Sequence, residues 1–326
     1  LERRALANLA RLAGPTRRPF RPVNPAPTLR APSPRVANIA IAVMCLVWGS
    51  TWIVIKSGLR DLPPQTSGAA RFWIAGVAMA GLTALLRRAE GGARPPAWLW
   101  LSLGALNFGA SYAIVYRTST LLPSGLISLL WGVFPMLSAL VSHVWIPGER
   151  LRPQQWAGFA LGLVGLSVLF ATDLPALGPG AISAAAFLLL SPIVSVVGNT
   201  LVKLHGRGVS SLALNRNAMF VGAALLSVAA FATESPTQAR WTPAAIGSVL
   251  YLALMGTVLT FGLYFWLLRS VPAHKLSLIA YITPPIALLL GVLVGGEQLT
   301  ASIVAGAASI LLGIVWVVRT RAPEAT

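Results

Sequence analysis

Ten apolar stretches, each long enough to cross a lipid bilayer as a helix, fill the chain from residue 37 onward. Crossing about 30 Å of hydrocarbon takes roughly 20 helical residues, and short joints with proline or glycine separate the stretches. We place the candidate spans at residues 37–58, 66–86, 97–117, 123–146, 154–171, 180–203, 210–231, 243–268, 272–295 and 300–319. The joints are too short for a further folded domain, so the sequence predicts an all-α integral membrane protein.

The composition excludes several other classes of protein. Only 10% of the 326 residues are charged, whereas soluble domains carry about 25%. Cys45 is the single cysteine, and the three histidines lie far apart, so we expect no disulfide, no metal site and no cofactor. A nucleotide-driven pump needs a G-x-x-x-x-G-K-[ST] loop, which the sequence lacks. We expect no catalytic residues, because no Asp, Glu, His and Cys cluster gathers near an interface.

Positive charge predicts the orientation in the membrane. The chain has 25 Lys and Arg against 8 Asp and Glu. Eight of the arginines lie in residues 1–36, which we interpret as a disordered basic tail. If this tail is cytosolic, segments on its side hold 19 of the 25 basic residues, and the opposite joints hold only Arg60, Arg117 and Arg240. We therefore expect both termini in the cytosol and a lipid partner for the charge, not nucleic acid.

The two halves of the chain match in order at a nearly constant offset. Pro135 corresponds to Pro284 at an offset of 149, and Gly148-Glu149 corresponds to Gly296-Glu297 at 148. Each half has five spans, an odd number, so the second half enters the membrane upside down relative to the first. Such inverted repeats are typical of alternating-access transporters. We place the first repeat at 37–172, the second at 178–320 and a C-terminal tail at 321–326.

The chain resembles the ten-span EamA-type carriers of the drug/metabolite transporter superfamily over about residues 37–320. This resemblance rests on Trp48-Gly49-Ser50-Thr51, Arg71-Phe72, Pro123, Pro135 with Gly148-Glu149, and the repeated Pro284 and Gly296-Glu297. It implies a central cavity formed by spans one to four and six to nine, with spans five and ten at the periphery. It also implies efflux of metabolites or amphipathic compounds. Small multidrug exporters of the same superfamily use a glutamate in their first span, which this chain lacks.

Polar and aromatic side chains recur at helical spacing on one face of several spans. In the fourth span, Ser124, Ser128 and Trp131 are spaced by four and three residues, and this face continues through the membrane. Such faces either line a substrate cavity or let helices pack closely and hydrogen-bond. Five of them in one repeat favour a cavity. The candidate cavity residues are Trp48, Thr51, Trp52, Asn107, Ser111, Ser128, Trp131, Ser195, Asn199, Thr260, Tyr264 and Tyr281.

Charged residues in or beside the spans are candidate gates. Arg71 and Arg216 lie about six residues into the second and seventh spans, where charge is costly. They either bind a substrate carboxylate or act as structural or gating charges that snorkel or pair with a loop carboxylate such as Asp61. We favour the structural or gating role. Lys56, near the outer end of the first span, is expected to snorkel. Glu149 and Glu297 are interpreted as caps of the next helix or as gate residues.

Prolines and glycines within the spans have a mechanical interpretation. Pro135 and Pro284 occupy equivalent mid-span positions, where a proline bends a helix. Each is either a hinge for alternating access or a static kink. Gly158 and Gly165 in the fifth span, with Gly306 and Gly313 in the tenth, predict faces for close helix packing.

The sequence indicates a multi-pass secondary transporter of the bacterial inner membrane, acting as a monomer on a small-molecule substrate. We expect export of small neutral, zwitterionic or amphipathic metabolites, such as amino acids. An uptake permease for sugars or nucleotide sugars is the alternative, and a membrane-embedded enzyme is a remote one.

Overall fold

The computed structural model describes residues 32–146, 150–268, 271, 276 and 278–319. Residues 1–31 of the predicted basic tail, the tail at 321–326 and Glu149 lie outside the described residues. The first helix starts inside the predicted tail, at Pro34. Ser33 is the N-cap of this helix, because its hydroxyl accepts a hydrogen bond from the Val36 amide at 3.4 Å. The basic composition of the segment gave no indication of this cap.

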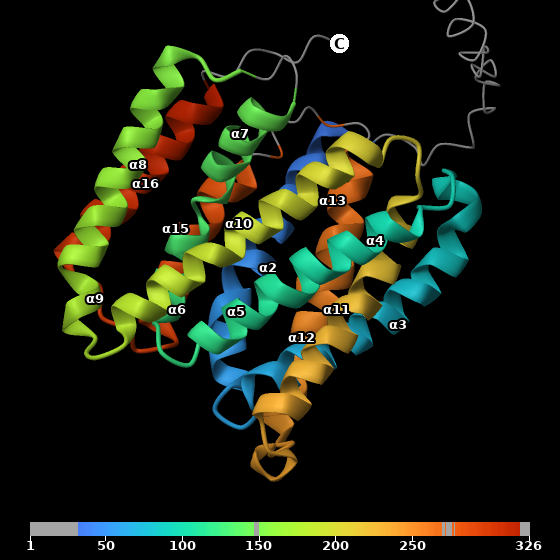
Figure 1. The fold of residues 1–326 in the computed structure, drawn as a ribbon, viewed down its shortest axis with the longest axis horizontal. Helices are drawn as coiled ribbons and strands as arrows, with labels where there is room; N and C mark the ends of the chain where they lie inside the picture. The colour runs from blue at the N-terminus through green and yellow to red at the C-terminus, as the bar shows by residue number, and fades with distance from the viewer. Residues whose placement is uncertain (1–31, 147–149, 269–270, 272–275, 277, 320–326) are drawn as a thin grey trace, which may run out of the picture.

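Most of the described residues are helical (Figure 1). Their bounds are α2 (Pro34–Gly58), α3 (Pro64–Glu90), α4 (Ala97–Leu103), η1 (Gly104–Ala110), α5 (Ser111–Thr118), α6 (Ser124–Trp131), α7 (Phe134–Trp145), α8 (Pro153–Ala171), α9 (Asp173–Ala176), α10 (Ala181–His205), α11 (Ser211–Thr233), η2 (Pro236–Gln238), α12 (Pro243–Ala253), η3 (Leu254–Leu259), α13 (Thr260–Leu268), α15 (Leu278–Leu293) and α16 (Ala301–Arg319).

Within the described ranges, eight helical segments are long and apolar enough to cross a membrane. Two shorter apolar helices, Ile279–Leu293 and Ala301–Val317, occupy the places expected for the ninth and tenth spans. Large apolar side chains such as Leu85 and Phe231 are exposed on the outer faces of these helices, as expected for helices that contact lipid.

α3 and α11 lie antiparallel, and each ends at the start of the other. The Glu90 carboxylate, at the end of α3, accepts a hydrogen bond from the Leu212 amide at 2.9 Å. The Glu234 carboxylate, just after α11, accepts from the Gln65 and Thr66 amides at 2.6 and 2.8 Å. Free amides and the helix dipole favour a carboxylate at a helix N-terminus, so each half of the chain caps a helix of the other.

α8 and α16 form a second antiparallel pair, drawn side by side in green and red in Figure 1. A Cβ atom added at Gly158 would lie 2.7 Å from the Gly313 carbonyl oxygen, and one at Gly165 would lie 2.6 Å from that of Gly306. The two backbones therefore approach too closely for any side chain at these positions. This confirms the prediction that these glycines serve helix packing.

Three predicted spans are not continuous α-helices. π-helical segments interrupt the third span at η1 and the eighth at η3, at equivalent places in the two halves; such segments often mark functional sites. The fourth span breaks at Gly132 and Val133, between α6 and α7, so its polar face is not carried by one helix as expected. Pro135 lies in the first turn of α7, where its missing amide costs no hydrogen bond, whereas Pro284 lies inside α15.

Candidate functional site

A cluster of buried hydroxyls joins α5, α6 and α10. The Ser111 and Ser191 hydroxyls are 2.8 Å apart, and Ser195 donates to Ser111 at 3.0 Å. The Trp131 indole donates to the Ser191 hydroxyl at 3.0 Å, and the Trp52 ring of α2 lies 6.2 Å from the Trp131 ring. We call these five residues the serine cluster. It satisfies its hydroxyls internally while it connects the two halves of the chain.

A second polar group surrounds the π-helical segment η3. The Gly256 carbonyl accepts hydrogen bonds from the Trp48 indole at 3.3 Å and the Thr260 hydroxyl at 3.0 Å. Thr51 is buried and donates to the Trp48 carbonyl at 2.7 Å, and the Tyr264 ring lies 6.2 Å from Trp48. The backbone of a π-helix offers acceptors that a regular helix uses internally, so these predicted cavity residues meet here.

The remaining predicted cavity residues are more scattered. Asn107 in η1 lies against Gly198, with its side-chain oxygen buried and without a hydrogen bond among the described residues. The Ser128 hydroxyl is likewise buried without one in the described ranges. Tyr281 packs against the apolar core around the serine cluster, whereas Asn199 is exposed and joins neither group.

Arg71 is buried in the interior of the helix bundle, with 2% of its surface exposed. Its Nε donates to the Thr257 hydroxyl in η3 at 3.1 Å. Its guanidinium carbon lies 4.9 Å from the centre of the Tyr112 ring and 5.3 Å from that of Phe72, within range of a cation–π interaction. A positive charge is therefore held between helices of both halves.

One alternative for Arg71 is wrong, whereas the role of Arg216 stays a prediction. Arg71 does not snorkel or pair with Asp61, whose carboxylate instead lies 3.9 Å from the Arg240 guanidinium. The Arg71 side chain lies among Thr257, Tyr112 and Phe72 and is almost fully covered, so it does not reach the surface. Arg216 is half-buried and donates two hydrogen bonds to the Asn217 side chain, at 3.0 and 2.9 Å. The two arginines occupy matching sequence positions in different environments.

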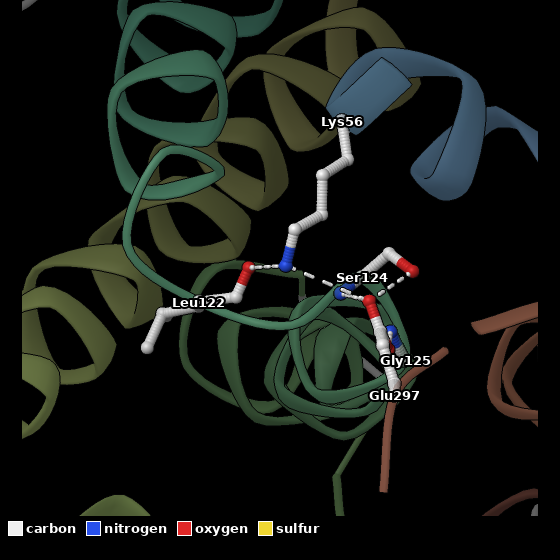
Figure 2. A network of polar contacts seen from close by, with 5 residues as sticks. All are labelled: Lys56, Leu122, Ser124, Gly125 and Glu297. Atoms are coloured by element: carbon white, nitrogen blue, oxygen red, sulfur yellow. Dashed lines mark hydrogen bonds and ion pairs between the residues drawn. The ribbon is translucent and has the colours of Figure 1, made fainter. Parts of the chain in front are cut away.

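Glu297 caps a helix of the opposite half (Figure 2). Its carboxylate accepts hydrogen bonds from the Ser124 amide at 2.5 Å, the Ser124 hydroxyl at 2.8 Å and the Gly125 amide at 3.0 Å. The Lys56 ammonium lies 3.6 Å from the same carboxylate and donates to the Leu122 carbonyl at 3.1 Å. We call these residues the Glu297 network. It ties α2 and the start of α6 to the segment between α15 and α16.

Two predictions about this network need correction. Glu297 caps α6, not the helix that follows it, because the α6 N-terminus is packed beside α15. Lys56 is bound inside the network instead of snorkelling freely, although 36% of its side chain remains exposed. Glu149, its predicted counterpart, lies outside the described residues.

An open cleft of about 270 Å³ lies at the end of the bundle where α3 begins and α11 ends. Its lining holds the three basic residues expected opposite the cytosol, together with two carboxylates: Arg60, Arg117, Arg240, Asp61 and Glu234. These side chains come from segments far apart in the sequence, and Arg117 lies in the last turn of α5. The cleft gives this end of the molecule a polar, charged mouth.

Sequence reasoning missed several residues of these groups. Ser191 and Thr257 were on polar faces by spacing, yet neither entered the candidate set. The tyrosines around Arg71 carried no signal, because an aromatic residue in an apolar span resembles core packing. Glu90 and Glu234 could have been found from the repeat. Glu90 follows Arg71 by 19 residues at the end of the second span, and Glu234 follows Arg216 by 18 residues at the end of the seventh.

Comparison with known proteins places these features in a family. The model of the EamA-like transporter family matches the chain twice, at residues 35–171 and 182–319. A solved crystal structure with 20% sequence identity has a TM-score of 0.65 and covers 89% of this chain and 99% of its own, which shows a shared fold.

Similar proteins are transporters by name. The uncharacterized transporter YoaV of Bacillus subtilis is 27% identical over 85% of this chain and 94% of its own. The uncharacterized inner membrane transporter YedA of Escherichia coli is 28% identical over 80% of this chain and 83% of its own. A probable amino-acid metabolite efflux pump of Salmonella typhimurium is 27% identical over 83% of this chain and 91% of its own. With its two matched copies and its apolar helices, the chain is a multi-pass membrane protein that belongs to the EamA-like transporter family.

Proposed function

We propose that the protein is a secondary transporter that exports small neutral, zwitterionic or amphipathic metabolites by alternating access. The observation that carries this proposal is the pair of buried polar groups built from both family copies. The serine cluster joins α5 and α6 of the first copy to α10 of the second, and Arg71 of the first copy bonds Thr257 of the second. A solute held between the copies would be released by their relative movement. Both groups are complete within one chain, which favours a monomer.

We further propose ten spans in two inverted five-span repeats, with both termini in the cytosol. The antiparallel pairs α3 with α11 and α8 with α16 support this arrangement, because each pair joins matching helices of the two copies. The cleft that gathers Arg60, Arg117 and Arg240 is then the external mouth. Inverted halves give one mouth to each side of the membrane as the copies rock.

The Glu297 network is the proposed external gate. It lies where α6 begins, and α6 contributes Trp131 to the serine cluster. Release of the α6 N-terminus from Glu297 would let α6 move away from α15 and open a path to the cluster. Bonds that form only in one state can hold a two-state element closed.

The neutral or zwitterionic substrate class rests on where the carboxylates lie. In the described part of the chain, Glu90, Glu234 and Glu297 each bind a helix N-terminus. Asp61 lies between α2 and α3, and Asp173, the first residue of the short helix α9, accepts hydrogen bonds from the Thr300 and Ser302 hydroxyls. An organic-cation exchanger of the small multidrug type needs a carboxylate within a span. The Salmonella relative, named as an amino-acid metabolite efflux pump, favours export over uptake.

The proposal is tested by metabolite profiling. An exporter-deficient bacterium expresses the protein, Trp131→Ala or an empty vector, and the medium is analysed by mass spectrometry. We expect one or more small metabolites to accumulate with the native protein and to fall toward the vector level with Trp131→Ala, at equal membrane abundance. Accumulation identical to the vector, together with uptake of no added metabolite into vesicles, overturns the proposed transport function.

A further inference from the structure

Four buried polar atoms without hydrogen-bond partners gather along α3 and the facing helix α5. They are Gln65 Oε1, Ser67 Oγ, Arg71 Nη1 and Tyr116 Oη, and none forms a hydrogen bond within the described residues. Their residues are 7%, 0%, 2% and 0% exposed. Buried polar groups are nearly always satisfied, so atoms of this kind need an explanation.

Three of these groups face one another. The Tyr116 hydroxyl interacts with both the Arg71 guanidinium and the Ser67 hydroxyl, in a geometry that falls short of a well-formed hydrogen bond. Ser67 precedes Arg71 by four residues, which places both on one face of α3. Ser67, Arg71 and Tyr116 therefore form one polar group between α3 and α5, roughly one to two turns from the α3 N-terminus.

The charge at this point is unbalanced by protein. Arg71 is the only buried Lys or Arg among the described side chains. The described acidic residues closest to it in sequence or at the adjoining helix ends bind elsewhere: Asp61 binds Thr242 at 2.7 Å, and Glu234 binds Thr66 at 2.8 Å. The faces of Tyr112 and Phe72 supply only partial compensation. A buried charge is costly unless a counter-charge and hydrogen bonds satisfy it.

We propose that Arg71, Tyr116 and Ser67 bind the carboxylate of the transported solute. This inference rests on the proposed transport function and narrows its substrate class to solutes with one anionic group, zwitterions included. A carboxylate has two oxygens and about four acceptor sites, which suit a guanidinium nitrogen and two hydroxyls. One arginine balances one negative charge, so a monoanion fits better than a phosphate dianion.

The location agrees with this role. Arg71 lies seven residues into α3, which is about 10 Å along the helix from its first residue, Pro64. Pro64 lines the charged cleft that also holds Arg60 and Arg117. A released anion would therefore leave past a mouth with exposed basic side chains. Thr257 fixes the Arg71 Nε, which leaves the other end of the guanidinium for the solute.

The first arm of the test identifies what is exported. Profiling of the medium is repeated with Arg71→Gln, Tyr116→Phe, Ser67→Ala and the control Thr83→Val. Thr83 is a buried residue of the same helix whose hydroxyl bonds only the Met79 carbonyl. We expect each solute enriched by the native protein to carry a carboxylate, and its export to be lost in Arg71→Gln but retained in Thr83→Val. Enrichment of solutes that lack an anionic group overturns the inference and leaves the transport function standing.

The second arm measures binding without transport, on purified full-length protein in detergent. Benzoate and benzamide differ in charge but little in shape, and their binding is followed by the shift in unfolding temperature. We expect benzoate to stabilise the native protein more than benzamide. Loss of a charge-assisted hydrogen bond should weaken benzoate binding about tenfold to a hundredfold in Arg71→Gln, and loss of a neutral one about fivefold in Tyr116→Phe.

Two outcomes of the second arm contradict the inference. One is equal stabilisation by benzoate and benzamide, which indicates that the four atoms hold water or serve packing alone. The other is benzoate binding that Arg71→Gln and Tyr116→Phe leave unchanged. If Arg71→Gln fails to fold, Tyr116→Phe and Ser67→Ala decide the matter, because each removes only one hydroxyl. Preferential benzoate binding with no export in the first arm supports the site and contradicts transport.

Discussion

Glu297→Gln should weaken the contact between the two halves of the transporter without changing the size of the side chain. The carboxylate accepts three hydrogen bonds, two from amides at the start of α6 and one from the Ser124 hydroxyl. An amide has one oxygen, and its NH₂ group would face one of the donors. The substitution therefore replaces charge-assisted bonds by one or two neutral ones and leaves a donor unsatisfied.

The size of this effect follows from the geometry. A hydrogen bond to a charged group contributes about 1.5–3 kcal/mol and a neutral one about 1 kcal/mol, and the α6 dipole adds roughly 0.5 kcal/mol. The ion pair with Lys56 adds less than about 1 kcal/mol, because that side chain is 36% exposed. We expect a total loss of about 3 kcal/mol. At roughly 2 °C per kcal/mol for a chain of this size, the unfolding temperature should fall by about 6 °C.

The assay is thermal unfolding of purified protein in detergent, monitored by loss of the monodisperse peak in size-exclusion chromatography. Gln298→Ala is the matched control, because Gln298 is the exposed neighbour of Glu297 and should leave the unfolding temperature unchanged. Equal unfolding temperatures for Glu297→Gln and the native protein would show that the α6 amides find other partners, and the reasoning would be wrong. As a gate residue, Glu297 should also change the transport rate when it is replaced.

Three further predictions follow from the contacts. Trp131→Phe removes the 3.0 Å bond to Ser191 but keeps the ring; transport measured by metabolite efflux should fall severalfold at equal membrane abundance, and unaltered efflux contradicts a role for the serine cluster. Gly165→Leu puts a side chain where even a Cβ lies 2.6 Å from a carbonyl oxygen; we expect loss of the monodisperse protein, whereas Leu163→Ala, at an exposed position, should be tolerated. In a variant without Cys45, single cysteines at Arg207 and Thr237 report topology; an impermeant maleimide applied to whole cells should label position 237 and not 207, and the reverse result overturns the proposed orientation.

The correspondence between sequence and fold is good where a pattern repeats over a whole helix. The glycine spacing of the fifth and tenth spans predicted a packing face, and the paired glycines of α8 and α16 are in backbone contact. The length of a membrane span is predicted from hydrophobicity summed over many residues, so one polar residue does not change the prediction. Summed hydrophobicity does not distinguish an α-helix from a π-helix or a turn. For this reason η1, η3 and the break at Gly132 were not predicted.

Individual contacts could not be predicted in this way. Spacing placed Glu297 at the end of a span and suggested a cap, but the choice of α6 as its partner depends on which helix end packs beside it. Lys56 and Arg71 both lie within spans, and the expectation of snorkelling treated each helix as if it stood alone in lipid. In the bundle, Lys56 reaches a carboxylate and Arg71 is covered by Tyr112 and Phe72.

The sequence by itself determined that the chain is a membrane protein with two related halves, because hydrophobic length and ordered Pro, Gly and Glu positions are one-dimensional properties. It also identified most residues of the serine cluster from helical spacing. Only the tertiary structure decided which polar groups meet across the two halves and which remain without a partner. That depends on the packing of helices far apart in the chain, such as α3 with α11 and α5 with α10. The unpaired atoms around Arg71 are visible only there, because hydrogen-bond satisfaction is a property of neighbours in space.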